Sequence, residues 1–115
     1  MSAQLFPRLH HADDRLAFDV DGRSVSYQAF AHLAAAHADS VRDLTPGAHV
    51  GVWTFGAIET LAALVGNACA GLVSVPLNPK LGSAELAHIL DDAKPVRSFA
   101  ADVAAVRDRD ETVLA

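Results

Sequence analysis

Lys80 is the one cation in the two loops of this sequence where contact with a ligand is expected. These loops, Thr54 to Gly56 and Leu77 to Gly82, each follow a short apolar segment typical of a β-strand. In open α/β sheets, ligands bind outside the carboxyl ends of parallel strands. Lys80 could there meet a phosphate or a carboxylate, although a lone exposed lysine is more often a solvated charge. Thr54 and Phe55 are the other candidates for substrate contact, and we interpret Phe55 as a core residue rather than a pocket wall.

No other pattern in the sequence supplies the chemistry of an active site. There is no GxxxxGK[ST] or GxGxxG motif, and no Ser/Thr/Gly/Lys cluster that could direct backbone N–H groups at a phosphate. His10 and His11 precede Asp13 and Asp14, but adjacent side chains point apart and no second pair of ligands has a useful spacing. We therefore expect no catalytic residue, no metal ligand and no bound cofactor in this chain alone.

The two loops must be positioned by a unit of strand, helix and strand. Val50 to Trp53 is an apolar, mostly β-favouring run. From Ile58 to Cys69, apolar residues recur at helical spacing on almost every side. Gly71 ends this helix in a left-handed conformation, and Leu72 to Val75 forms the next strand, which ends at Pro76. The two strands are expected to be parallel, with a right-handed crossover.

Gly66 lies in the middle of this central helix. Replacing a helical glycine by alanine usually gains roughly 0.5 to 1 kcal/mol of stability. We expect Gly66→Ala to do the same, unless a neighbouring element packs too closely to admit the methyl group.

The residues before this unit predict a hairpin and a helix. Leu16 to Val20 and Arg23 to Val25 flank Asp21-Gly22, a strong signal for a two-residue turn. Ser26 is a suitable N-cap for the helix that follows. The apolar face of that helix consists of Phe30, Leu33, Ala34, His37 and Val41. Residues 1–14 show little periodicity, and we interpret them as an N-terminal arm laid over the surface.

The residues after Gly82 continue the alternation of helices and strands. Ser83 is a plausible N-cap for a helix that Pro95 ends, and Val96 to Ala100 is a candidate strand. A short helix is expected over Asp102 to Arg107, and Thr112 to Leu114 resembles the start of one more strand. The order predicts an α/β fold, in which a small antiparallel hairpin is followed by βαβαβ units of a parallel sheet with helices on both faces.

Composition excludes several classes of function. The 115 residues suffice for one domain, and 51% hydrophobic with 20% charged residues is a globular composition. The net charge of -5, with scattered arginines, gives no basic face for nucleic acid or anionic lipid. No segment is long and apolar enough to span a bilayer, so a cytoplasmic location is expected. The single Cys69 cannot form an internal disulfide, and we interpret it as a small core residue.

Several of these segments resemble one enzyme family, over about Arg15 to Pro95. They are SYQAF at 26–30, GVW at 51–53, AGLVSVPLNP at 70–79 and ELAHILDD at 85–92. They look like the opening of the adenylate-forming acyl-CoA ligases, and the stretch from Pro76 to Asp92 closely resembles the malonyl-CoA synthetases. The resemblance implies that a carboxylate attacks the α-phosphate of ATP with Mg²⁺ to give an acyl adenylate, and that coenzyme A (CoA) then displaces AMP. The acid would be malonate or methylmalonate, and ATP, Mg²⁺ and CoA would serve the intact family enzyme.

The resemblance also implies more chain than these residues provide. The family's phosphate-gripping loop, its acidic ribose and magnesium ligands, its Arg for the second carboxylate and its late catalytic Lys belong further along, and none has a match here. The sequence ends within an apolar run, whereas domains usually end in exposed polar segments. We expect residues 15–115 to be a truncated part of the family's N-terminal α/β domain.

A helix that is apolar on nearly every side needs more cover than a small sheet with few helices provides. The expected partner is therefore the remainder of a ligase chain or, through exposed apolar surface, another copy of this chain. The alternatives are a stand-alone small α/β binding or interaction protein and an inactive remnant, both without catalysis.

Overall fold

The computed structural model describes residues 16–20 and 23–113. Their elements are β1 (Leu16–Val20), β2 (Arg23–Ser26), α2 (Tyr27–Ser40), β3 (His49–Trp53), α3 (Ile58–Cys69), β4 (Val73–Leu77), α4 (Ser83–Ala93) and β5 (Arg97–Phe99). The predicted arm, the turn Asp21-Gly22 and the end of the last predicted strand lie outside the described residues. None of the helices in the described part is long and apolar enough to cross a membrane.

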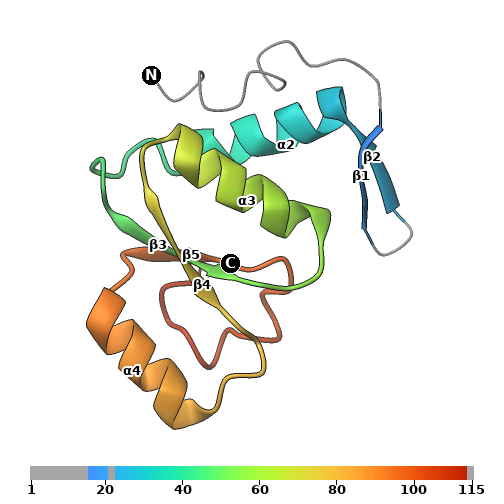
Figure 1. Ribbon diagram of the computed structural model, residues 1–115. Coiled ribbons are helices and arrows are strands. Elements are labelled where there is room, and N and C mark those ends of the chain that lie inside the picture. The colour runs from blue at the N-terminus through green and yellow to red at the C-terminus, as the bar shows by residue number, and fades with distance from the viewer. Residues whose placement is uncertain (1–15, 21–22, 114–115) are drawn as a thin grey trace.

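The centre of the fold is a parallel sheet with the strand order β4-β3-β5. Val50 in β3 pairs with Ser74 on one side and with Arg97 on the other. Helices α2 and α3 cover one face of this sheet, and α4 with the segment after β5 covers the other (Figure 1). The central strand is apolar because both of its faces are covered, and Val50, Val52 and Trp53 are all buried. The predicted α/β class and the helices on both faces are confirmed.

The N-terminal hairpin pairs β1 with β2 in antiparallel fashion, as predicted. Ser26 caps α2, because its hydroxyl oxygen accepts a hydrogen bond from the Ala29 backbone N–H at 3.1 Å. Phe30 and Ala34 then face inward from the helix and are buried. Phe30 packs with Val25 and with Ile58 of α3, so the hairpin and the two helices share one apolar cluster.

Two polar side chains reinforce the contact between these helices and the sheet. His37 of α2 places Nε2 at 2.8 Å from Oδ1 of Asn67 in α3, and Asn67 Nδ2 donates to Ser74 of β4 at 3.0 Å. Burial lowers the pKa of His37 below its ordinary value, and the hydrogen bond with Asn67 opposes this only in part. The neutral imidazole packs edge-on against the ring of Phe99, with the two centroids 5.2 Å apart.

Gly66 lies at the crossing of α2 and α3. A Cβ atom built at this position would lie 2.8 Å from the Ala34 carbonyl oxygen and 3.0 Å from Cδ2 of His37. The neighbouring helix therefore packs too closely to admit a methyl group. This is the close packing by a neighbouring element under which no gain was expected. We therefore expect Gly66→Ala to lower the stability of the chain rather than raise it.

The turn from α3 into β4 depends on Gly71, whose φ of 76° lies in the left-handed region, as predicted. The strand that follows was predicted over Leu72 to Val75, and these bounds were wrong. It begins at Val73 and continues through Pro76 to Leu77. Val73 N donates to the Ala48 carbonyl, and the Leu77 carbonyl accepts from Thr54 N. Since alternate residues point to opposite sides, the Pro76 nitrogen faces the open edge of the sheet, where no donor is needed.

Helix α4 begins one residue earlier than its predicted cap implies. Gly82 is the N-cap residue, without a side-chain hydrogen bond, and Ser83 is already helical, so the prediction of Ser83 as N-cap was wrong. The helix ends as expected before Pro95. Lys94 adopts a left-handed conformation with φ of 46° and ends the helix through a bond from its N–H to the Leu90 carbonyl.

The segment after β5 forms turns, so the predicted helix over Asp102 to Arg107 was wrong. A helix this short is not stable by itself, and among residues 102–107 only Val106 is buried, which leaves no apolar face to hold such a helix against the sheet. The predicted strand from Thr112 is reduced, within the described residues, to one parallel bridge between Ser98 and Val113.

Candidate functional site at the carboxyl edge of the sheet

The structure brings the two predicted loops together at one edge of the sheet. Trp53 at the end of β3 pairs with Leu77 at the end of β4, and Val52 pairs with Phe99 at the end of β5. The loops that follow these strands, with Thr54, Lys80 and the 100–113 segment, therefore begin side by side. This is the edge where open α/β sheets place their ligands.

Thr54 and Phe55 serve the scaffold in this structure. The Thr54 N–H donates to the Leu77 carbonyl oxygen at 2.9 Å, and its hydroxyl group donates to the same oxygen at 3.3 Å. Thr54 thus fastens the ends of β3 and β4 to each other. Phe55 is half-buried and packs against the cluster around Trp53. This packing fits the interpretation of Phe55 as a core residue.

Lys80 is exposed, and its backbone is held in a tight turn. Its N–H donates to the Asn78 side-chain oxygen at 2.9 Å, and the Leu81 N–H donates to the Asn78 carbonyl at 3.0 Å. Asparagine commonly fixes a turn through such a bond to the residue two positions further on. The side chain of Lys80 extends from a defined backbone position at the edge of the sheet.

Arg109 holds the same loop from the other side, a role that sequence reasoning missed. Its guanidinium group donates one hydrogen bond to the Pro79 carbonyl at 2.8 Å and another to the Leu81 carbonyl. The guanidinium carbon also lies 5.4 Å from the centroid of the Trp53 ring. A cation above an indole ring is attracted by the ring quadrupole. Arg109 therefore connects the segment after β5 to the ends of both β3 and β4.

Asp110 is the second residue that sequence reasoning missed. It is 3% exposed, and its carboxylate accepts a hydrogen bond from Trp53 Nε1 at 3.0 Å and another from the Thr112 backbone N–H at 3.0 Å. Burial raises the pKa of Asp110, but hydrogen bonds from Thr112, Ser98 and Trp53 outweigh it, so the pKa lies below its ordinary value. The buried carboxylate stays charged because its hydrogen-bond donors compensate for lost water.

The sequence around these two residues hid their role. Arg107 to Glu111 consists only of charged residues, a pattern typical of a solvated loop. One available signal was the single tryptophan of the chain. A buried indole N–H usually needs an acceptor, but nothing in the sequence pointed to Asp110 as that acceptor.

The edge has few groups that could perform chemistry. The Thr54 hydroxyl group and the Asn78 side-chain oxygen already bond to the backbone. Within residues 16–20 and 23–113, no group of three His, Cys, Asp or Glu side chains is arranged to hold a metal ion. Cys69 lies away from this edge, at the far end of α3, and burial raises the pKa of its thiol. The arrangement can position a loop and one ammonium group.

Comparison with known proteins identifies the relatives of this arrangement. The family model described as AMP-binding enzyme matches residues 7–114. A search of curated proteins found no match.

Several solved structures resemble this chain over nearly the whole of its 115 residues. MatB from Rhodopseudomonas palustris, in its apo form, has a TM-score of 0.75 and 30% identity over 94% of this chain and 22% of MatB. An ATP-bound RpMatB-BxBclM chimera has a TM-score of 0.77 and 26% identity over 98% of this chain and 25% of the chimera. NpsA from Klebsiella oxytoca, in complex with 3-hydroxyanthranilyl-AMSN, has a TM-score of 0.77 and 21% identity over 90% of this chain and 22% of NpsA. The chain thus spans 22–25% of the length of these proteins.

Proposed function

Because the chain belongs to the AMP-binding enzyme family, we propose that it is the N-terminal scaffold portion of an ATP-dependent acyl-CoA ligase. The observation that carries this proposal is the sheet edge itself. Its loops are fastened by Thr54, Arg109 and Asp110, whereas no group of three His, Cys, Asp or Glu side chains among the described residues is arranged to hold a metal ion. The chain would position the start of the ligase's large domain without completing an active site.

The proposed reaction of the whole ligase has two steps. A carboxylate attacks the α-phosphate of ATP, which releases diphosphate and gives an acyl adenylate, and the thiol of CoA then displaces AMP. We propose malonate or methylmalonate as the acid, because residues 76–92 resemble the malonyl-CoA synthetases. A cytoplasmic location is part of the same proposal.

The residues that the structure describes at this edge do not fit a magnesium site. Mg²⁺ prefers carboxylate oxygens and water in octahedral geometry. At the carboxyl edge the one buried carboxylate, Asp110, already accepts bonds from Trp53 and Thr112, and Lys80 is a cation. We therefore assign metal binding, and the groups that complete the nucleotide site, to the rest of the ligase chain.

The partner in this proposal is the remainder of a ligase chain, since the chain corresponds to 22% of the length of MatB. Self-association stays a prediction of the sequence. Among the described residues, the large hydrophobic side chains that are exposed are Val73 and Val96, at 46% and 59%. Both lie beside His49, because Val73 pairs with it and the Val96 N–H donates to its carbonyl. An apolar contact would therefore begin at the amino edge of the sheet, opposite the candidate site.

We expect the purified chain to show no malonate-dependent exchange of radiolabelled diphosphate into ATP, because the groups that would bind the phosphates lie elsewhere in the ligase. The assay compares the chain with a protein-free blank and with an intact malonyl-CoA synthetase as the positive control. Exchange clearly above the blank, and dependent on malonate, would show that the chain holds a complete active site and would refute the scaffold proposal.

A further inference from the structure

We infer that Arg109 is a positioning residue, which fixes the loop from Asn78 to Gly82 so that Lys80 is presented at the carboxyl edge of the sheet. Lys80 would in turn contact an anionic group of the substrate or nucleotide. This last step rests on the proposed function, whereas the fixing of the loop does not.

Arg109 holds the residues on both sides of Lys80. Arg109 donates to the carbonyl of Pro79, just before Lys80, and to the carbonyl of Leu81, just after it. A planar guanidinium fork can hold two carbonyls at once, which a lysine ammonium does less well. The bond from Lys80 N–H to Asn78 is local to the loop and does not tie it to the sheet. Among the hydrogen bonds of the described residues, those from Arg109 connect the middle of this loop to a distant segment.

Arg109 is itself held in place by contacts with the core. Asp110, the next residue, accepts from the buried Trp53 indole, and the guanidinium of Arg109 lies over the same ring. The backbone of residues 109 and 110 is therefore fixed relative to the end of β3. Loss of the Arg109 side chain would release the loop around Lys80, while the hydrogen bond between Asp110 and Trp53 would still hold the segment after β5 on the core. A substitution at Arg109 should then loosen the loop more than it weakens the whole chain.

The positions of the lysines allow opening of the loop to be measured by proteolysis. Lys80 and Lys94 are the two lysines of the chain, and Lys94 precedes Pro95, which hinders proteases. A lysine-specific endoprotease should therefore cut the folded chain at Lys80 when the loop opens, and mass spectrometry distinguishes the products. Far-UV circular dichroism reports separately whether the chain remains folded, because Arg109 lies over the ring of Trp53, the single tryptophan, and its substitution would itself change the fluorescence.

In the unsubstituted chain, cleavage after Lys80 should be no faster than global unfolding allows. In Arg109→Gln we expect cleavage about tenfold faster or more, because the loop then opens locally while the core stays closed. Arg107→Gln is the matched control, since Arg107 is exposed in the same charged segment, and its rate should equal that of the unsubstituted chain.

Three outcomes would overturn the inference. The first is rapid cleavage of the unsubstituted chain while circular dichroism shows a folded chain. The second is equal cleavage of Arg109→Gln and Arg107→Gln. The third is loss of the folded circular dichroism spectrum in Arg109→Gln without protease, because Arg109 would then stabilise the whole fold rather than the loop.

The functional step is tested in an intact malonyl-CoA synthetase whose first segment is replaced by this chain. Lys80→Ala and Arg109→Gln should each lower kcat/KM by about tenfold, and the double variant should lose no more than either alone if Arg109 acts through Lys80. Additive losses would show that Arg109 does not act through Lys80. An inactive parent hybrid would count against the proposed function, and the protease result would still decide the fixing of the loop.

Discussion

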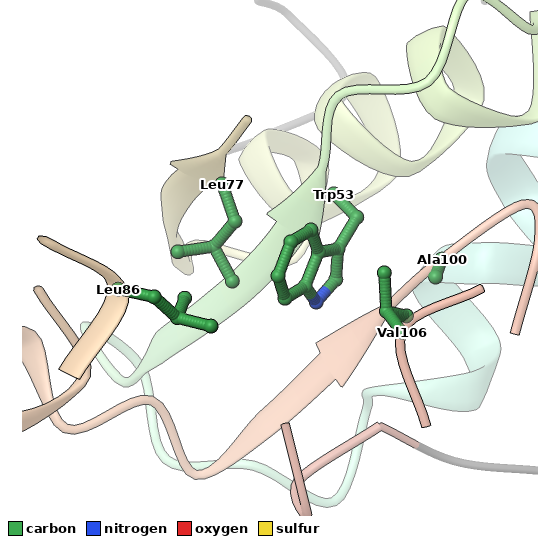
Figure 2. Packing of buried hydrophobic residues seen from close by; sticks show 5 residues of the cluster. All are labelled: Trp53, Leu77, Leu86, Ala100 and Val106. Atoms are coloured by element: carbon green, nitrogen blue, oxygen red, sulfur yellow. The ribbon is translucent and has the colours of Figure 1, made fainter. Parts of the chain in front are cut away.

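Replacing Trp53 by alanine should lower the free energy of unfolding by about 3–5 kcal/mol, the range for truncating a large aromatic side chain in a core. Trp53 is 0% exposed and forms one apolar cluster with Leu77, Leu86, Ala100 and Val106. Figure 2 shows its indole between Leu77 and Leu86 on one side and Ala100 and Val106 on the other. The cluster joins β3, β4, α4 and the segment after β5, so the cavity would weaken every contact on this face of the sheet.

The loss of the indole N–H lowers the free energy of unfolding of Trp53→Ala further. Asp110 would keep its charge in a buried position and lose the indole donor. Trp53→Phe is the matched control, because it keeps an aromatic ring and removes the N–H, and it should cost about 1–3 kcal/mol. Urea denaturation followed by circular dichroism measures both variants. A loss below about 1 kcal/mol for Trp53→Ala would mean that the cluster does not hold α4 on the sheet.

Gly66→Ala should destabilise the chain by about 1–3 kcal/mol, although alanine is the better helix former. The methyl group would lie 2.8 Å from the Ala34 carbonyl oxygen, a backbone atom that moves only if α2 moves. Such a shift would also strain the contact between His37 and Asn67, which lies at the same crossing. The gain in helix propensity, roughly 0.5–1 kcal/mol, is smaller than the expected cost of overpacking.

Gly56→Ala is the control for this substitution. A Cβ atom at Gly56 meets nothing within 4 Å, so alanine there should change stability by less than about 0.5 kcal/mol. Denaturation in urea with Trp53 fluorescence as the probe serves for both variants. A Gly66→Ala chain as stable as the parent would show that α2 and α3 lie further apart than in this structure.

The regular part of this fold could be predicted because its residues agree with each other at short range. The apolar run in β3, the helical periodicity of α3 and the capping hydroxyl of Ser26 each favour one local structure. Pro76 was misread as the end of a strand. Its effect on pairing depends on whether a third strand lies beyond it, which is a property of the sheet and not of the local sequence.

The candidate site was predicted only by position. Parallel-sheet topology correctly brought Thr54 and Lys80 to one edge, because that follows from the order of strands. The residues that fix this edge, Arg109 and Asp110, come from a segment without periodicity, and Asp110 contacts Trp53 across 57 positions in the sequence. Long-range contacts made by a charged loop leave no pattern in a single sequence, so the roles of these two residues could not be predicted from it.

The central claim is that this chain is the scaffold segment of an adenylate-forming ligase, and one replacement experiment tests it most directly. In an intact malonyl-CoA synthetase, the segment corresponding to residues 7–114 is replaced by this chain, and malonate-dependent exchange of diphosphate into ATP is measured. The same synthetase lacking the segment should be inactive and serves as the control. We predict that the hybrid exchanges diphosphate within about tenfold of the parent rate, because this chain supplies the scaffold and Lys80, while the groups that complete the active site lie outside the segment. A hybrid that is folded and monodisperse but exchanges no faster than the deletion control would contradict the account.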